Sequence, residues 1–382
     1  MSRLPRRSAF AVFTAGAIAL TLAGAAAATA SGPTRSSHHA ENEFRQVNLI
    51  SNRSDQGAQV VDPSLQNPWG LAFGPTTPLW AADNNAGVAT VYAVSPGGTK
   101  ASKLSLTVTL PGGRASTGDG PSPDGQVFNP TTGFVVTSKA GAGPALFIFS
   151  AEAGQISAWS PKADPISATG RSTGQVMFSS RTAVYKGLAI AATDDGTFLY
   201  ASNFHDGTVD VFDSNFHRVH LLGNFRDPAL PAGYAPFGIQ NIDGLIYVTY
   251  ALQDAQKRDD VAGPGHGFID IFTTDGLLIK RLASRGHLNS PWGLARAPQS
   301  FGRFGGDLLV GDFGDGLINV FNQFSGHFIA QLRDEHHMPI SIDDLWGLRF
   351  GTATTGGTRT LLFSAGINDE KDGLVGSINA VP

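Results

Sequence analysis

The chain has 382 residues and a formal net charge of −4, and it is rich in glycine (47 residues) and proline (22) while only 15% of its residues are charged. It contains no cysteine, which excludes disulfides and thiolate metal sites. No run of basic residues indicates nucleic acid or an anionic membrane as a partner.

The first 30 residues have the three-part layout of a secretory signal peptide. Three arginines precede an apolar run at 9–22, and small residues lead to a cleavage site expected after Ala30. The apolar run is shorter than the roughly 20 residues of a spanning helix, so we expect no membrane span after cleavage. The sequence thus predicts a protein that is secreted or held in the cell envelope, with a flexible linker at 31–43.

A short step into a strand, centred on a glycine, recurs six times along the rest of the chain. The glycines are 63, 54, 51, 55 and 54 residues apart, and units of about 40 to 50 residues are typical of four-stranded propeller blades. The copies are NPWGL at 67–71, NPTTG at 129–133, YKGL at 185–188, APFGI at 235–239, SPWGL at 290–294 and DLWGL at 344–348. The repeat predicts an all-β fold, a six-bladed β-propeller that spans residues 44–382.

The third unit shows the pattern of strands most clearly. Apolar or alternating runs at 188–192, 198–202, 209–212 and 219–222 are separated by turn residues, which predicts a four-stranded antiparallel blade. The sixth unit has no segment left for a fourth strand, whereas alternating residues at 44–50 precede the first unit. Because an open sheet edge favours aggregation, we expect this N-terminal strand to close the last blade as its outermost strand.

Aromatic residues precede the glycine in four of the repeats, at Trp69, Phe237, Trp292 and Trp346. We expect them to fill the space between neighbouring blades, while the glycine lets the innermost strand approach the crowded axis. The alternative is a platform on which a ligand stacks.

Five longer motifs carry a family resemblance: NPWGLA at 67–72, LWAADN at 79–84, VFNPT at 127–131, VYKGLA at 184–189 and LPAGYAPFGIQ at 230–240. They resemble an uncharacterised family of exported bacterial propeller proteins, related in shape to NHL-repeat propellers. More distantly, the repeats resemble lactonase-type and streptogramin-lyase-type propellers. The resemblance implies the fold and export, and it supplies no catalytic residue.

Strand parity gathers polar residues on one face. In a four-stranded meander, the loop before the first strand and the loop between the second and third strands emerge at the same end. Oxygen-bearing side chains in these loops predict a hard divalent cation such as calcium, with Asp83, Asn203, Asp312 and Asn368 as candidate ligands. The alternative is that turns favour these residue types because the side chains bond their own backbone.

Histidines are also concentrated on this face, and an imidazole there could act as a general base. The candidates for a catalytic role are His205, His266, His287 and His337. No zinc-protease, nucleophile-elbow or phosphate-loop motif accompanies them.

Two functions fit these features, and whether the protein is an enzyme stays open. The first is a binding or scaffold module that presents its loop face to a protein, a glycan or a small molecule. The second is a metal-assisted hydrolase or lyase, lactonase-like or streptogramin-lyase-like, with its site at the mouth of the channel. If the side chains proposed as metal ligands are turned into their own loops, the first function, binding, is favoured over the second.

Overall fold

The computed structural model describes residues 43–113 and 120–381. The predicted signal peptide at 1–30 and all but the last residue of the predicted linker at 31–43 lie outside the described residues. Within the described ranges, no helix is long and apolar enough to cross a membrane.

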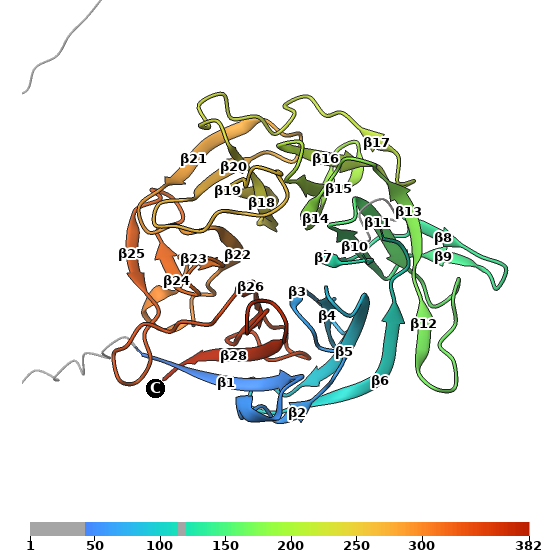
Figure 1. Cartoon of the computed structure of the whole chain (residues 1–382), viewed down its shortest axis with the longest axis horizontal. Helices are drawn as coiled ribbons and strands as arrows, with labels where there is room; N and C mark the ends of the chain where they lie inside the picture. Colours follow the sequence, from blue (N-terminus) through green and yellow to red (C-terminus); the bar gives the residue numbers. More distant parts are fainter. Residues whose placement is uncertain (1–42, 114–119, 382) are drawn as a thin grey trace, which may run out of the picture. The chain divides into compact units, whose positions relative to one another are not determined.

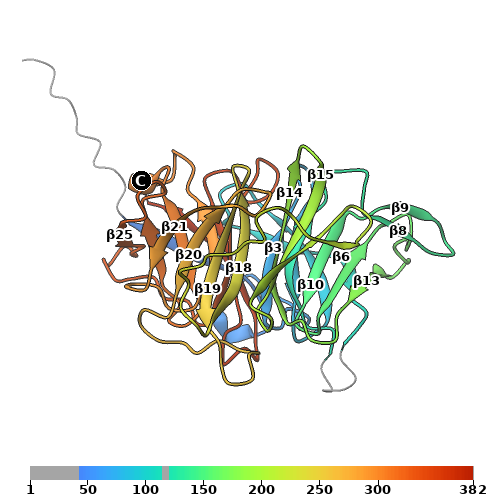
Figure 2. The ribbon, with the colours of Figure 1, turned by 90° about the horizontal axis from the view of Figure 1, so that it is seen from above.

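Six sheets surround a central axis, with strands β3, β7, β14, β18, β22 and β26 innermost (Figure 1). Seen side-on, the strands run between two faces (Figure 2). Blade one is β3 (Pro68–Ala72), β4 (Leu79–Asp83), β5 (Val88–Val94) and β6 (Ala101–Thr109); blade two is β7 (Pro123–Phe128), β10 (Phe147–Ala151), β11 (Gln155–Trp159) and β13 (Gln175–Ser179); blade three is β14 (Tyr185–Thr193), β15 (Gly196–Asn203), β16 (Thr208–Phe212) and β17 (Arg218–Val219). Blade four is β18 (Tyr234–Ile242), β19 (Leu245–Leu252), β20 (Phe268–Phe272) and β21 (Leu278–Ser284); blade five is β22 (Pro291–Arg296), β23 (Leu308–Asp312), β24 (Ile318–Phe321) and β25 (Phe328–Gln331); blade six is β26 (Leu345–Phe350), β27 (Leu361–Ala365), β28 (Leu374–Ala380) and β1 (Phe44–Ser51).

Short elements decorate these blades. Strand β2 (Val60–Val61) pairs in parallel with β1, and β12 (Arg171–Thr173) pairs in parallel with β6. Strands β8 (Val135–Thr137) and β9 (Ala142–Pro144) form a separate hairpin. Two 3₁₀ turns, η1 (Ser54–Gln56) and η2 (Gly302–Phe304), lie in connecting segments.

The predicted closure of the ring is confirmed. Strand β1 pairs antiparallel with β28, from Phe44 opposite Ala380 to Ser51 opposite Leu374. The Phe44 side chain is fully buried, and its ring lies 4.9 Å from that of Phe301 in blade five. The N-terminal strand therefore completes blade six and also packs against the neighbouring blade.

The predicted start of blade two is wrong. Its innermost strand is β7, which ends before Asn129, and its axial glycine is Gly125. The Asn129 side chain instead bonds the following turn, because its Oδ1 accepts from the backbone N–H of Thr131 at 3.0 Å. The Asn-Pro pair of blade two thus forms an Asx turn after the inner strand has ended. In blade one, the equivalent pair comes at the start of the inner strand.

The axial glycines allow neighbouring inner strands to approach closely, as predicted. A Cβ at Gly238 in blade four would overlap the backbone carbonyl oxygen of Trp292 in blade five. Only a residue without a side chain fits at this position.

Candidate functional site at the channel mouth

One residue from each blade precedes the axial glycine and lies at the same end of the axis, which we call the channel mouth. These six residues are Trp69, Asp124, Lys186, Phe237, Trp292 and Trp346. The antiparallel order of each blade sends this position to the same face as the loops between second and third strands. We call that side the mouth face.

The aromatic members of this set meet across the axis. The Trp69 and Trp346 rings stack with centroids 3.5 Å apart, and Trp292 lies edge-on to Trp69 at 6.2 Å. Phe237 lies 5.9 Å from Trp346, and Phe313 stacks on Trp346 at 4.1 Å. Trp346 of blade six contacts Trp69 and Trp292 of the two adjacent blades, so the predicted packing between neighbouring blades is present. Contacts between blades one and five and between blades four and six show that the rings also meet across the mouth end of the axis.

Lys186 takes the equivalent position in blade three and is almost fully buried, with its side chain 3% exposed. Its ammonium pairs with Glu152 and lies 3.1 Å from Asp259 Oδ1. It also sits 5.0 Å from the centroid of Trp69, within range of a cation–π interaction. Burial alone would lower the pKa of Lys186, but the two carboxylates outweigh it and raise this pKa. The side chain therefore stays charged inside the aromatic cluster.

Glu370 is linked to the aromatic cluster by a chain of hydrogen bonds. Trp346 Nε1 donates to Asn67 Oδ1 at 3.0 Å, and Asn67 Nδ2 donates to Glu370 Oε2 at 2.8 Å. Burial is the main cause that raises the pKa of Glu370, to about 7, and the negative charges of Glu152 and Asp344 add to it. Asp344 accepts from the backbone N–H of Glu370 at 3.1 Å, and burial raises its pKa to about 6. Two carboxyl groups near the mouth thus titrate close to neutral pH.

Asp124 occupies the equivalent position in blade two and is completely buried. Its carboxylate accepts hydrogen bonds from the Ser150 hydroxyl and from the backbone N–H of Gly125. Burial raises the pKa of Asp124 well above its usual range, although these hydrogen bonds oppose the shift.

The predicted metal ligands are bonded within their own blades or loops. Asp83 accepts from Thr90 Oγ1 at 2.7 Å, and Asp312 accepts from Asn319 Nδ2 at 2.6 Å. Asn203 donates to Asp206 at 2.9 Å. Across the described ranges, no group of three or more His, Asp or Glu side chains is placed to hold one metal ion.

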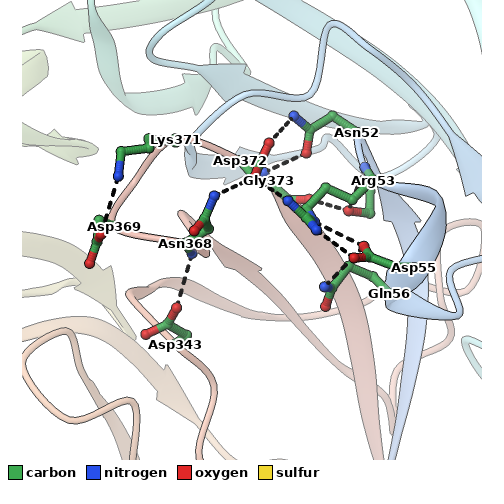
Figure 3. Close-up of polar contacts among 11 residues, drawn as sticks. Asn52, Arg53, Asp55, Gln56, Asp343, Asn368, Asp369, Lys371, Asp372 and Gly373 are labelled. Atoms are coloured by element: carbon green, nitrogen blue, oxygen red, sulfur yellow. Dashed lines mark hydrogen bonds and ion pairs between the residues drawn. The ribbon is translucent and has the colours of Figure 1, made fainter.

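Asn368, the fourth predicted ligand, belongs to a polar corner of blade six (Figure 3). Its Nδ2 donates to Asp372 Oδ2 at 2.8 Å, and its backbone N–H donates to Asp343 Oδ2 at 3.0 Å. Arg53 and Asn52, which follow β1, also bind Asp372. The corner ties the N-terminal strand to the β27–β28 loop.

The predicted catalytic histidines are dispersed. His205 Nδ1 donates to Asp206 Oδ1 at 2.9 Å, so His205 and Asn203 share a partner. His266 Nδ1 lies 2.7 Å from the carbonyl oxygen of Val261. His287 stacks on Phe328 at 3.6 Å, and His337 Nδ1 lies 3.0 Å from Glu43 Oε1, beside the start of β1.

The predicted loop face includes the groups that meet at the channel mouth, namely Lys186, Glu152, Glu370 and Asp344, but the sequence analysis selected none of them as a metal ligand or a catalytic residue. One signal for them was present. Where other repeats place an aromatic residue before the axial glycine, the third repeat places Lys186. A charged residue at a position that faces a packed axis requires buried partners of opposite charge.

These strands and loops define the class of protein, a six-bladed β-propeller. No family model matches the chain. It is 34% identical over 340 residues to the uncharacterised protein R648 of Acanthamoeba polyphaga mimivirus, covering 86% of this chain and 78% of R648. It is 32% identical over 334 residues to the uncharacterised protein L690 of the same virus, covering 86% of this chain and 84% of L690.

The chain belongs to the family of these mimivirus proteins. The curated relatives are viral, so the expected bacterial and exported character stays a prediction. Among solved structures, an α-L-arabinanase of Penicillium chrysogenum, complexed with arabinobiose, is 11% identical with a TM-score of 0.50, covering 88% of this chain and 99% of that one. A virginiamycin B lyase of Staphylococcus aureus is 13% identical with a TM-score of 0.48, covering 89% and 99%. The arabinanase likeness shows the fold alone, and the lyase likeness adds nothing to it.

Proposed function

We propose that this protein is a binding module that presents its mouth face to an amino-bearing glycan or to a basic segment of a protein. The observation that carries the proposal is the aromatic cluster that fills the mouth end of the axis. Stacked tryptophans and the buried Lys186 ion pairs close the mouth, so a ligand of this face meets the surrounding loops. The carboxylates of Asp83 and Asp312 are turned into their own blades, which is the arrangement that favours binding.

Acidic side chains surround the closed mouth. Asp259, in the long β19–β20 loop, has a side chain that is 65% exposed, and that of Asp369 in the β27–β28 loop is 89% exposed. Asp343, in the segment leading into β26, is also exposed. Carboxylates held by different loops attract cationic ligands and orient them through hydrogen bonds.

Asp259 connects the buried Lys186 at the centre of the mouth face with the exposed acidic loops around it. Its Oδ1 contacts Lys186 at 3.1 Å, yet most of its side chain remains accessible. A cationic group bound at Asp259 would therefore compete with the central lysine for one carboxylate.

The test is binding of a chitosan oligosaccharide and of oligolysine, with neutral dextran as the comparison probe. We expect the triple variant Asp259→Asn, Asp343→Asn, Asp369→Asn to bind about tenfold more weakly at low salt. The matched control removes three carboxylates from turns on the opposite face, Asp194→Asn, Asp195→Asn, Asp275→Asn. Equal weakening by the two triple variants, or binding of dextran as strong as that of the cationic probes, would contradict the proposal.

A second candidate function is acid–base catalysis at the mouth. It is favoured by Glu370, because a carboxyl group with a pKa of about 7 can both donate and accept a proton near neutral pH. If the loop face carries out hydrolysis or elimination, Glu370→Gln removes that activity while leaving chitosan binding unchanged. Loss of both in this variant would count against a separate catalytic role.

A further inference from the structure

A hollow of about 440 Å³ opens on the face opposite the channel mouth, where blades five, six and one meet. Its walls come from the β5–β6 turn, the β26–β27 connection, the end of β28 and the segment after β22. The lining residues are Gly97, Ser300, Gly357, Thr358, Arg359, Thr360, Asn379 and Ala380. Cavities at the junction of structural units are common ligand sites.

The side chains that line this hollow include a positive charge and no negative charge. Arg359 brings a positive charge, Ser300, Thr358 and Thr360 bring hydroxyl groups, and no acidic side chain lines it. Arg359 is exposed, and no hydrogen bond or ion pair joins its side chain to another residue of the described ranges. In a chain with a net charge of −4, an exposed arginine that lines a hollow without carboxylates is available to bind an anion.

The wall of the hollow is fixed by hydrogen bonds. Thr360 Oγ1 donates to Asn379 Oδ1 at 2.7 Å, and Asn379 Nδ2 donates to the carbonyl oxygen of Gly97 at 3.1 Å. Gly97 and Gly357 have φ of +82° and +89°, and a Cβ at Gly97 would meet nothing within 4 Å. The backbone at Gly97 thus faces open space, while the N–H groups of Gly98 and Gly357 donate to Ser95 and Thr352 and hold these turns in place.

We propose that this hollow binds a small oxyanion, a phosphate, sulfate or carboxylate group, through the Arg359 guanidinium and the exposed hydroxyl groups of Ser300 and Thr358. The planar guanidinium offers paired donors that match two oxygens of such a group. This site is separate from the mouth face, so it does not depend on the function proposed above.

The experiment is a titration of the full chain followed by amide chemical shifts of residues 97, 357 and 359. The probes are inorganic phosphate, sulfate, glucuronate and glucose, at ionic strength held constant with sodium chloride. We expect saturable shifts with the three anions and none with glucose, and the order of affinity among the anions identifies the source of the oxyanion. Arg359→Gln should weaken binding by about tenfold or more, since it removes charged hydrogen bonds.

Arg181→Gln is the matched control, because Arg181 is an exposed arginine in the segment that leads into β14, on the mouth face. It should bind the anions as the unaltered protein does. The proposal is overturned if no anion gives a saturable shift, if glucose binds as well as glucuronate, or if the two arginine variants lose affinity equally. Unchanged shifts elsewhere in the spectrum of Arg359→Gln would show that the variant is folded.

Discussion

Replacing Glu370 with glutamine should make the protein more stable, and the gain should grow as the pH rises. Burial raises the pKa of Glu370 from its usual 4.5 to about 7. Between these two values, the folded protein holds a proton that the unfolded chain has released, so the unaltered protein loses stability with rising pH. Glutamine has no proton to release, and its amide oxygen can still accept the hydrogen bond from Asn67.

The size of the gain follows from the two pKa values. They differ by about 2.5, which corresponds to about 3 kcal/mol in the free energy of unfolding. The unfolded carboxyl group is already mostly ionised at pH 5, so about 2.5 kcal/mol of this falls between pH 5 and pH 8. Asp344 titrates in the same direction and is present in both proteins, so its own contribution cancels from the comparison, and its repulsion of Glu370 is already included in the raised pKa of Glu370.

The assay is denaturant unfolding of both proteins at pH 5 and pH 8, followed by tryptophan fluorescence. Asp55→Asn is the control, because hydrogen bonding to Arg53 lowers the pKa of Asp55 to about 2 and keeps it ionised at both pH values. Its effect on stability should be the same at pH 5 and pH 8. A gain for Glu370→Gln that does not change with pH would refute the reasoning and return Glu370 to the role of an ordinary surface carboxylate.

Two further changes test the architecture. Phe44→Ala should lower the free energy of unfolding by about 3–5 kcal/mol, because a fully buried ring between β1 and blade five is lost; Val61→Ala, an exposed change in the neighbouring β2, should alter it by less than about 0.5 kcal/mol. Gly238→Ala should lower the melting temperature measured by scanning calorimetry, since its Cβ would overlap the Trp292 carbonyl oxygen, whereas Gly120→Ala meets open space and should not. Equal melting temperatures for the two glycine variants would contradict the close approach of inner strands.

The fold could be predicted because each blade repeats the same local requirement. A glycine where the inner strand nears the axis marks five of the six blades correctly, and the alternation at 44–50 indicates the closing strand. The start of blade two was predicted wrongly because Asn129-Pro130 has the same residue types as the pair that leads into the first strand of blade one. The same two residue types serve as a turn after the strand in one blade and as its beginning in the other.

The site could be predicted only in part. The antiparallel order of the strands correctly predicts that these loops lie on one face. It does not predict which side chains contact each other across the axis. Asp83 and Asp312 were selected as metal ligands for their residue type. Each instead accepts a hydrogen bond from a residue seven positions later in the chain, in the next strand of its blade. The link from Trp346 through Asn67 to Glu370 joins residues 279 and 303 positions apart and exists only once the ring is closed.

The most direct test of the central claim is a hydrogen-exchange map of the protein with and without a chitosan oligosaccharide. The account predicts slower exchange in the mouth-face loops at 254–266, 312–316 and 366–372, with the turns of the opposite face unchanged. Slower exchange confined to the opposite face or to the outer strands of the blades would contradict it.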